Sequence, residues 1–536
     1  MAAFFAVLIV VACSPVWGVG YFINQDGSGH VHSAFLMTEL LKGDPTLSEF
    51  YVLNSISMPN ASGHWILMVL LQLFSAFTVT KIMVTLTFAG FVLGVGWLRY
   101  STVGNDGLKT SLLIGTAMAF NWLWLVGFYN FIVGSIVFLA AIGLYYKWRE
   151  HMTAWRTAAL SGLLLFGYLS HIVSFLALAG SVVILSVFVA NSSRVRTVLL
   201  SLVAFVPVIP HAIVYKQMSE KGEGFSPVWR SLSDPYSLIS WIHQVRSADP
   251  FIIISRKAFP FVSTTSDYFA IFTPGLWLVI ALVLLGIATW LGRSRNNEGW
   301  KANYPFIILA AGSLILAAFA PDDFVQTNGG VLRERLLMFG FLFFIPIIRT
   351  DGAPVLKRAA QFCLVFVILF QTLAVWDYAL LSNREAKEFL VGAEELRKSP
   401  SSMLITVDSE PLRFHASTIP QLNCYNGIGN NNIIWDNYEF GHYLFPVVTR
   451  NVSDRRFIHD LTTSEYLLSD LSADEYEDKI NRLNSSLASY NGRIETAAVW
   501  GQDPHVEAVL SQWFETEPYF QNGRLRLFRH KHAATP

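Results

Sequence analysis

The sequence predicts an all-α integral membrane protein that ends in a small α/β domain. Only 14% of the 536 residues are charged and 53% are hydrophobic, whereas soluble domains carry about 25% charged residues. Apolar runs crowd the first 380 residues, and the rest of the chain has the composition of a soluble domain. We therefore predict a membrane domain over 1–380 and a C-terminal domain over 381–536.

Eleven apolar segments are candidates for membrane-spanning helices, each of which needs about 20 residues. The first has no Lys or Arg before it, so we interpret it as a retained helix and not as a cleaved signal. In chain order the segments are 2–22, 79–98, 109–126, 129–147, 157–172, 174–191, 197–216, 268–292, 303–320, 334–349 and 356–379.

The orientation in the membrane depends on the short apolar stretch 63–78. Lys and Arg cluster on the cytoplasmic side of membrane proteins, and the five basic clusters of this chain share one side only if 63–98 crosses the bilayer once. We therefore expect 63–78 to lie flat at the interface. The N-terminus is then cytoplasmic, whereas the first outer loop, 23–78, and the C-terminal domain are extracytoplasmic. The basic clusters are Arg99 to Lys109, Lys147 to Arg156, Arg194 with Arg196, Arg293 to Lys301, and Arg349 to Arg358.

Charge and cysteine content argue against two classes of protein. The net charge is zero, which gives no basis for nucleic-acid binding. Cys13, Cys363 and Cys424 are too few and too scattered for a disulfide framework or a zinc knuckle. The informative residues are therefore the polar ones near the membrane.

The first outer loop carries Asp26 near its start, in Asn24-Gln25-Asp26, directly after the first predicted span. An ionisable group at the membrane surface is costly and suggests a function, and Gly27 and Gly29 let the backbone turn tightly beside it. The alternative is that Asp26 caps a helix predicted from about His30 to Lys42. Position alone does not separate a catalytic role from a capping role.

Four histidines are predicted on the same outer side as Asp26: His30, His32, His64 and His171. A zinc site needs three or four ligands in a fixed geometry, and the His30-x-His32 pair has no recognisable third ligand. Hydrogen bonding to a phosphate or a sugar is therefore the favoured role. No metal is assigned and no cofactor is required, although a divalent cation stays open as an alternative.

The segment that opens a late predicted span carries Arg333 and Arg335, about 200° apart on a helix. One of them is expected to pair with a nearby acid, and the other to bind a phosphate, for which the guanidinium group is well shaped. The preceding Asp322 and Asp323 either coordinate a divalent cation or simply end a helix, and we favour the second interpretation.

A tight turn between two predicted spans carries Tyr129 and Asn130, and His171 joins two other spans at a comparable depth. Taken alone, Asn130 is explained by its ability to satisfy the turn backbone. Taken together, an aspartate, several histidines, an asparagine and an arginine pair on one side of the membrane favour a single outward-facing site.

The C-terminal domain shows mixed periodicity, which predicts a small α/β fold. Helical spacing covers 383–398 and 462–490, and strands are expected at 402–408 and 523–529. A polar loop, 424–432, is followed by several aromatic residues that suit contact with a sugar or an acceptor.

This arrangement resembles the GT-C class of membrane glycosyltransferases, which includes the protein O-mannosyltransferases and the aminoarabinose transferase of lipid A. Asp26 matches the acidic residue that follows the first span in that class. The segments 30–42 and 63–78 match its interfacial helices, and Arg333-Glu-Arg335 matches its late basic motif.

The resemblance implies an inverting enzyme that moves a sugar from a polyprenyl-phosphate donor to a hydroxyl of a lipid, glycan or protein acceptor. It implies that Asp26 is the general base and that Arg335, helped by Arg333 or a histidine, stabilises the departing phosphate. It also places the protein in a bacterial inner or plasma membrane, with the bilayer as a partner. The predicted substrate-binding residues are His30, His32, His64, Tyr129, Asn130, His171, Arg333 and Arg335.

Two other classes of protein remain as alternatives: a transporter or flippase of lipid-linked intermediates, and a non-catalytic scaffold. A transporter is expected to show repeat symmetry and broken helices near the bilayer midplane, and the sequence has no visible internal repeat. A scaffold has no reason to bring distant outer loops together. Convergence of those loops is therefore the observation that favours an enzyme.

Overall fold

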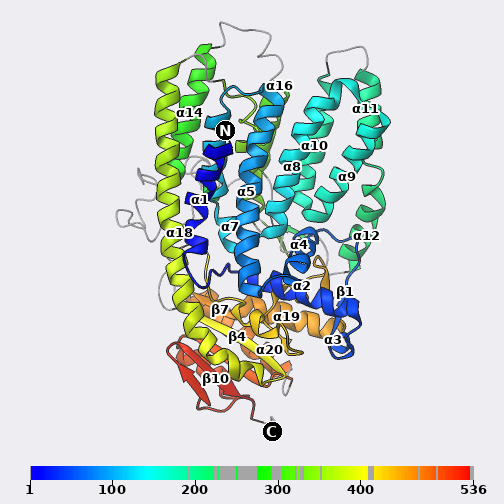
Figure 1. Ribbon diagram of the computed structural model, residues 1–536. Helices are drawn as coiled ribbons and strands as arrows, with labels where there is room; N and C mark the ends of the chain where they lie inside the picture. Colours follow the sequence, from blue (N-terminus) through cyan, green and yellow to red (C-terminus); the bar gives the residue numbers. More distant parts are fainter. Residues whose placement is uncertain are drawn as a thin grey trace.

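The protein is an elongated helical bundle with an α/β unit at one end (Figure 1). The architecture is that of a computed structural model. Its described residues are 2–189, 194–221, 226–228, 249–251, 274–292, 304–319, 323–325, 331–349, 353–408, 414, 416–468, 471–489 and 493–531. Parts of the predicted loop 217–267 and Asp322 of the Asp322-Asp323 pair lie outside these residues.

Apolar helices form the bundle, and the described ones follow the predicted spans closely. They are α1 (Ala2–Trp17), α5 (Ala76–Val103), α6 (Leu108–Ala119), α7 (Trp122–Val126), α8 (Tyr129–Trp148), α9 (Ala154–Ser170), α10 (Ile172–Val187), α11 (Arg194–Val203), α12 (Val208–Lys221), α14 (Pro274–Gly292), α16 (Tyr304–Phe319), α17 (Leu332–Leu342) and α18 (Pro354–Arg397).

Four of the described helices, α5, α8, α14 and α18, are long and apolar enough to cross a membrane, and the bent pair α11–α12 is a fifth if it is one span. Large apolar side chains such as Leu199, Phe362 and Leu373 are more than half exposed on the bundle. Many exposed apolar side chains on helices of this length and hydropathy suit lipid and not water. The chain is therefore an integral membrane protein.

The predicted span 109–126 is broken into two helices, α6 and α7. Asn121 lies at the break, where its side chain accepts a hydrogen bond from the backbone N–H of Trp124 at 2.8 Å and so caps α7. Asparagine is among the residues that most favour this position. The break turns the chain toward Gly127 and the start of α8, close to the predicted site.

The C-terminal part is built on a mixed sheet in the order β5-β4-β8-β10-β9, with β7 also paired to β4. The central strand β4 is parallel to β5, β7 and β8, whereas β10 is antiparallel to β8 and β9. The strands are β4 (Ser401–Asp408), β5 (Ile433–Ile434), β7 (Tyr466–Leu468), β8 (Thr496–Trp500), β9 (Phe520–Asn522) and β10 (Leu525–Arg529), and the helices packed with them are α19 (Val452–Ser464), α20 (Ala473–Ser489) and α21 (Pro504–Leu510).

The first outer loop lies between the bundle and this sheet (Figure 1). It forms α2 (Gly27–Lys42), α3 (Pro45–Phe50), β1 (Tyr51–Leu53) and α4 (Ser62–Leu71). Strand β1 pairs with β6 (Val447–Thr449) of the C-terminal part. Helix α18 runs without a break across the boundary predicted between residues 380 and 381. The two parts are therefore joined by a strand pair and by a continuous helix.

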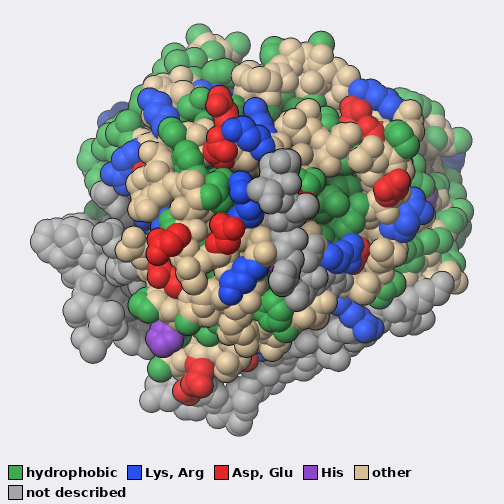
Figure 2. All heavy atoms as spheres, turned by 90° about the horizontal axis from the view of Figure 1, so that it is seen from below, with side chains coloured by type: hydrophobic (Ala, Val, Ile, Leu, Met, Phe, Trp, Pro, Cys, Tyr) green, Lys and Arg blue, Asp and Glu red, His purple; other side chains and the backbone are tan. Residues whose placement is uncertain are grey.

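The face at the C-terminal end carries interspersed acidic and basic side chains (Figure 2), whereas the bundle exposes large apolar side chains. Such mixed charge is typical of a surface in water. The molecule is thus divided into a lipid-compatible bundle and a water-compatible end. The junction between them is where the polar residues singled out in the sequence lie.

One stability prediction arises in the C-terminal part. Asp436 is buried and accepts hydrogen bonds from the Asn423 amide at 2.8 Å and the Leu404 N–H at 3.1 Å. Burial raises the pKa of Asp436 to about 7, against the opposing effect of these hydrogen bonds. The folded state thus holds this proton more tightly than the unfolded chain, where the pKa is about 3.9. The resulting stability is complete below about pH 4 and is lost as the pH rises through about 7.

We therefore expect the melting temperature of the full-length protein in detergent to fall between pH 5 and pH 8, with a smaller fall in Asp436→Asn. Asn keeps one acceptor oxygen but has no proton to lose in this range. The exposed Asp460→Asn is the matched control and should keep the wild-type slope. An unchanged slope in Asp436→Asn would show that other groups cause the fall.

Candidate functional site

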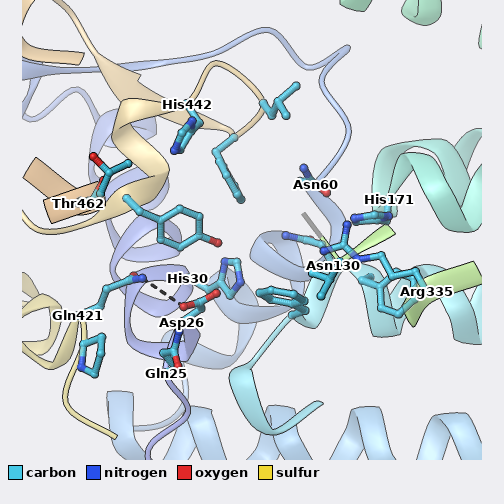
Figure 3. A pocket seen from close by; sticks show the side chains of 18 of the residues that line it. Gln25, Asp26, His30, Asn60, Asn130, His171, Arg335, Gln421, His442 and Thr462 are labelled. Atoms are coloured by element: carbon cyan, nitrogen blue, oxygen red, sulfur yellow. Dashed lines mark hydrogen bonds between the residues drawn. The ribbon is translucent and has the colours of Figure 1, made fainter. Parts of the chain in front are cut away.

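A cavity of about 400 Å³ lies at the junction of the bundle, the first outer loop and the C-terminal part. Its volume is in the range of small-molecule sites. Figure 3 shows Asp26 and His30 on one side and Arg335 with His171 on another. The lining residues are Gln25, Asp26, His30, Asn60, Phe128, Asn130, Phe131, His171, Val331, Arg335, Pro420, Gln421, Tyr438, His442, Leu444, Phe445, Thr462, Thr463 and Glu465.

Asp26 is held at the start of α2 by close backbone packing. Its N–H donates to the carbonyl of Val126 at 2.8 Å. A Cβ atom at Gly27 would lie 2.7 Å from the Tyr129 hydroxyl, and Gly127 has a φ of +102°, so only glycine allows this approach. The loop before α8 therefore fixes the position of Asp26.

The Asp26 side chain is not used as a helix cap. Asp26 occupies the N-cap position of α2, yet its carboxylate accepts no capping hydrogen bond from the helix. Instead, the Gln421 amide donates to Asp26 Oδ1 at 3.3 Å (Figure 3). This contact joins α2 to the C-terminal part. The capping interpretation, left open on sequence alone, does not describe this side chain.

Burial raises the pKa of Asp26 to about 8, and the negative charge of Glu439 adds to the effect, whereas a hydrogen bond with Gln25 opposes it. Desolvation disfavours a buried carboxylate because water no longer solvates the charge. A carboxyl group with a pKa near neutrality exchanges protons readily at physiological pH. Such groups are concentrated at catalytic sites.

The opposite wall carries Arg335, which lies near the start of α17. Its guanidinium carbon is 5.1 Å from the Phe128 ring centroid and 5.2 Å from that of Phe131. Stacking on aromatic faces orients the planar guanidinium group. His171 lies beside it in Figure 3 and caps α10 by accepting from the Val173 N–H at 3.2 Å. The cavity lining thus places the guanidinium group of Arg335 on a different wall from the carboxyl group of Asp26.

Strained backbone is concentrated at this cavity. Among the described residues, three that are not glycine have positive φ: Asn60 at 66°, Val331 at 64° and Gln421 at 60°. All three line the cavity. This conformation is costly for a β-branched residue such as Val331, and such outliers cluster at functional sites because the surrounding structure must hold them.

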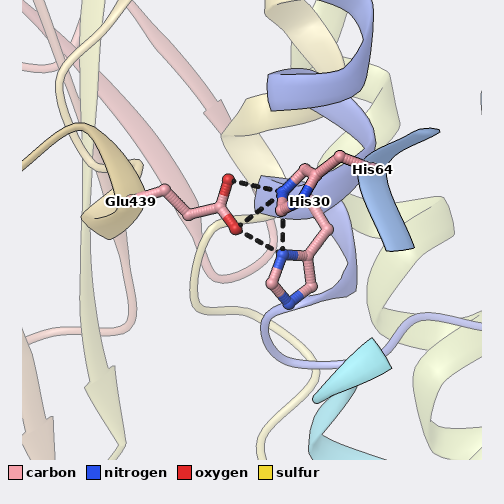
Figure 4. Close-up of side chains that lie close together, drawn as sticks. All are labelled: His30, His64 and Glu439. Carbon is pink, nitrogen blue, oxygen red and sulfur yellow. Dashed lines mark hydrogen bonds and ion pairs between the residues drawn. The ribbon is translucent and has the colours of Figure 1, made fainter. Parts of the chain in front are cut away.

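A second polar cluster lies behind the cavity wall. His30 from α2 and His64 from α4 both contact the buried carboxylate of Glu439 (Figure 4). His64 Nε2 lies 3.0 Å and 3.1 Å from the two Glu439 oxygens, and His30 Nδ1 lies 3.3 Å from His64 Nε2. Burial raises the pKa of Glu439, but the two histidines outweigh it and lower that pKa below its usual value.

The structure places some of the site residues predicted from the sequence in the cavity lining and others outside it. Asp26, His30, Asn130, His171 and Arg335 line the cavity, and His64 lies behind it in contact with Glu439. The remaining three, His32, Tyr129 and Arg333, are not in the lining.

Each of these three residues has a different environment. His32 packs its ring against Phe440, with centroids 5.5 Å apart, and burial lowers its pKa to about 3. Tyr129 donates to Asn24 Oδ1 at 2.9 Å and supports the loop under Asp26. Arg333 donates to the carbonyl of Ala318 at 3.4 Å.

Sequence reasoning expected aromatic residues of the C-terminal part to contact a substrate, but it missed most of the residues that this part contributes to the cavity. Gln421, His442 and Glu465 are lining residues from loops and helix ends of that part. Burial, and then the neighbouring His459, lowers the pKa of His442 to about 3, so it is a neutral hydrogen-bonding group. Only Tyr438 belonged to the aromatic run noted in the sequence. None of the others stands in a motif, so no sequence signal marked them.

Comparison with known proteins gives one result on the fold. No protein-family model and no curated protein matches the sequence. Among solved structures, the crystal structure of ArnT from Cupriavidus metallidurans bound to undecaprenyl phosphate is similar over 100% of this chain and 99% of that chain, with a TM-score of 0.53 and 10% identity. The chain has the ArnT fold.

The ArnT fold accounts for the whole chain, bundle and C-terminal part together. The predicted resemblance to the GT-C membrane glycosyltransferases, which named the aminoarabinose transferase type, is confirmed at the level of the fold. At 10% identity the likeness to ArnT extends to the fold alone. The activity must be argued from the cavity and its residues.

Proposed function

We propose that the protein is a membrane glycosyltransferase that moves a sugar from a polyprenyl-phosphate donor to an acceptor hydroxyl at this cavity. The observation that carries the proposal is the convergence of Asp26 and Arg335 in one cavity from segments about 300 residues apart. One wall offers a buried carboxyl group, and the other offers a stacked guanidinium group. These are the groups that a displacement at a sugar phosphate requires.

The transfer is a single displacement. The acceptor oxygen forms a bond to the anomeric carbon while the bond from that carbon to the phosphate oxygen breaks, and its electron pair stays on the phosphate. Asp26 takes the proton of the acceptor hydroxyl, and Arg335 stabilises the charge on the departing phosphate. Attack from the face opposite the phosphate inverts the anomeric configuration.

The fold supports a lipid-linked donor. ArnT, which has the same fold, is described in its crystal structure as bound to undecaprenyl phosphate. A polyprenyl chain needs an apolar path beside the cavity, and the bundle that ends at the cavity supplies exposed apolar surface. The acceptor is a hydroxyl of a lipid, glycan or protein.

The distribution of basic residues supports an extracytoplasmic site. Helices α5 and α8 end, and α11 and α18 begin, at the end of the bundle remote from the C-terminal part (Figure 1). The basic clusters at Arg99, Lys147, Arg194 and Lys357 belong to these helix ends. By the positive-inside rule that end is cytoplasmic, so the cavity and the C-terminal part are on the opposite side, outside a bacterial inner or plasma membrane.

The test is a transfer assay on the full-length protein in proteoliposomes. Polyprenyl-phosphate sugars with a radiolabelled sugar are supplied with an extract of envelope lipids and glycans as acceptors. We expect label in a product together with released polyprenyl phosphate. Label that crosses the membrane with its phosphate bond intact would instead identify a flippase. Absence of both cleavage and translocation, across a panel of hexosyl and pentosyl donors, would favour a scaffold.

A further inference from the structure

Among the described residues, one group of side chains has the composition of a metal site: His30, His64 and Glu439, whose ligand atoms all lie within 4.8 Å of one another. We propose that these three residues bind a Zn²⁺ ion that joins the first outer loop to the C-terminal part at the wall of the cavity. The site uses only one member of the His30-x-His32 pair, and it goes beyond the transfer reaction proposed above.

Hydrogen-bond chemistry at His64 points to a cation. His64 Nδ1 lies 2.9 Å from the carbonyl oxygen of Asn60. A carbonyl only accepts, and this contact is shorter than the 3.4 Å from His64 Nδ1 to the amide nitrogen of Asn130. We therefore assign the hydrogen to Nδ1, which leaves the Nε2 of a neutral His64 with a bare lone pair. That lone pair is directed at both oxygens of the Glu439 carboxylate (Figure 4). Two acceptor groups face each other, and a positive charge between them resolves the conflict.

The third ligand atom belongs to the same arrangement. His30 Nδ1 contacts Glu439 Oε1 and lies 3.3 Å from His64 Nε2. A single hydrogen on His30 Nδ1 can be donated to Glu439 or to His64, but not fully to both. A cation, in contrast, attracts His30 Nδ1, His64 Nε2 and the Glu439 carboxylate at the same time. Two imidazoles and a carboxylate are ligands that Zn²⁺ accepts, and three protein ligands with one open position are typical of its catalytic sites.

The spacing of the ligand atoms suits tetrahedral zinc. Ligands at about 2.0–2.1 Å from the metal are about 3.3–3.4 Å apart along the edges of a tetrahedron. The distances of 3.3 Å between His30 Nδ1 and His64 Nε2 and of 3.0–3.1 Å between His64 Nε2 and the Glu439 oxygens are close to this value. A small movement of the carboxylate completes the geometry.

Supporting residues hold the ligands in place. Asn60 accepts from His64 Nδ1, which fixes the ring in the tautomer that a metal requires. The Ser33 hydroxyl donates to Glu439 Oε2 and fixes the carboxylate. His30, His64 and Glu439 are each less than 5% exposed. His30 also lines the cavity, so the proposed site adjoins the cavity wall.

The test measures metal directly and needs no donor or acceptor. Full-length protein in detergent is stripped with a chelator, incubated with Zn²⁺ and passed through a desalting column, and bound zinc is measured by mass spectrometry. We expect about one Zn²⁺ per wild-type chain and an affinity at least about tenfold lower in Glu439→Gln and in His64→Asn. His32→Gln, two residues from His30 on the same helix, is the matched control and should keep the wild-type affinity.

A measurement on the wild-type protein keeps the proposal testable if a variant fails to fold. Co²⁺ bound at a tetrahedral nitrogen and oxygen site gives visible absorption bands, and we expect them in the wild-type protein with competition by Zn²⁺. A wild-type chain that retains no zinc and gives no cobalt bands would overturn the proposal and leave the cluster as a protonated histidine–glutamate pair. Zinc binding without sugar transfer would leave the metal site standing and would count against the proposed function alone.

Discussion

Replacing Asp26 by Asn is expected to lower the rate of sugar transfer by about 10²–10⁴-fold, the usual contribution of general-base catalysis. Asn has nearly the same shape, and its side-chain oxygen still accepts from the Gln421 amide as Asp26 does at 3.3 Å. It cannot take a proton from the acceptor hydroxyl. The donor should therefore still bind while turnover is lost, which is measured as a fall in kcat with little change in KM for the donor.

The matched control is Glu39→Gln on the same helix, α2. Glu39 is a surface carboxylate paired with Lys42 at 2.8 Å, remote from the cavity lining. This variant should keep wild-type transfer. If Asp26→Asn elutes as a monodisperse protein and still transfers sugar at the wild-type rate, the assignment of Asp26 as the base is wrong.

The position of Asp26 was accessible from the sequence because it depends on local rules. An aspartate that follows an apolar span and stands beside two glycines indicates a tight turn at the membrane surface. The sequence did not decide between a cap and a functional group, since both interpretations place the residue at the N-terminus of the same helix. The decision comes from Gln421, which is 395 residues away along the chain.

The two histidines of the H-x-H pattern show why a short motif on a helix does not identify two ligands of one site. His30 and His32 are adjacent in an H-x-H pattern, but residues two apart on a helix point in different directions. In the structure α2 already begins at Gly27, so His30 turns toward His64 and Glu439 while His32 packs against Phe440. The third ligand that the pattern lacked is supplied by another helix and by the C-terminal part.

Contacts between the first outer loop and the C-terminal part could not be predicted from sequence patterns. Hydrophobic periodicity located most helices and the strand at 402–408, because both depend on near neighbours. The pairing of β1 with β6 and the approach of Glu439 to α2 depend on tertiary packing over about 400 residues. A single glutamate in a short 3-10 helix carries no periodicity and no motif, so nothing marked Glu439 beforehand.

Replacing Arg335 by Ala is expected to lower transfer by about 10²–10³-fold, the typical loss when one group that stabilises developing negative charge is removed. The guanidinium group is oriented by stacking on Phe128 and Phe131 at 5.1 Å and 5.2 Å. It is placed across the cavity from Asp26, where a departing phosphate requires positive charge. Arg335→Lys should recover only part of the activity, because an ammonium group neither stacks in the same way nor binds phosphate through two parallel hydrogen bonds.

Comparing donors separates this role from a structural one. Two donors are compared: the polyprenyl-phosphate sugar, and an activated sugar donor whose leaving group needs less stabilisation of negative charge. The transfer rate with the activated donor should fall less in Arg335→Ala than the transfer rate with the polyprenyl-phosphate sugar. A merely structural arginine would affect both donors equally. Arg358→Gln, which removes an exposed guanidinium group near the start of α18, is the matched control and should keep full activity. Equal losses with the two donors would mean that Arg335 supports the cavity wall without acting on the phosphate.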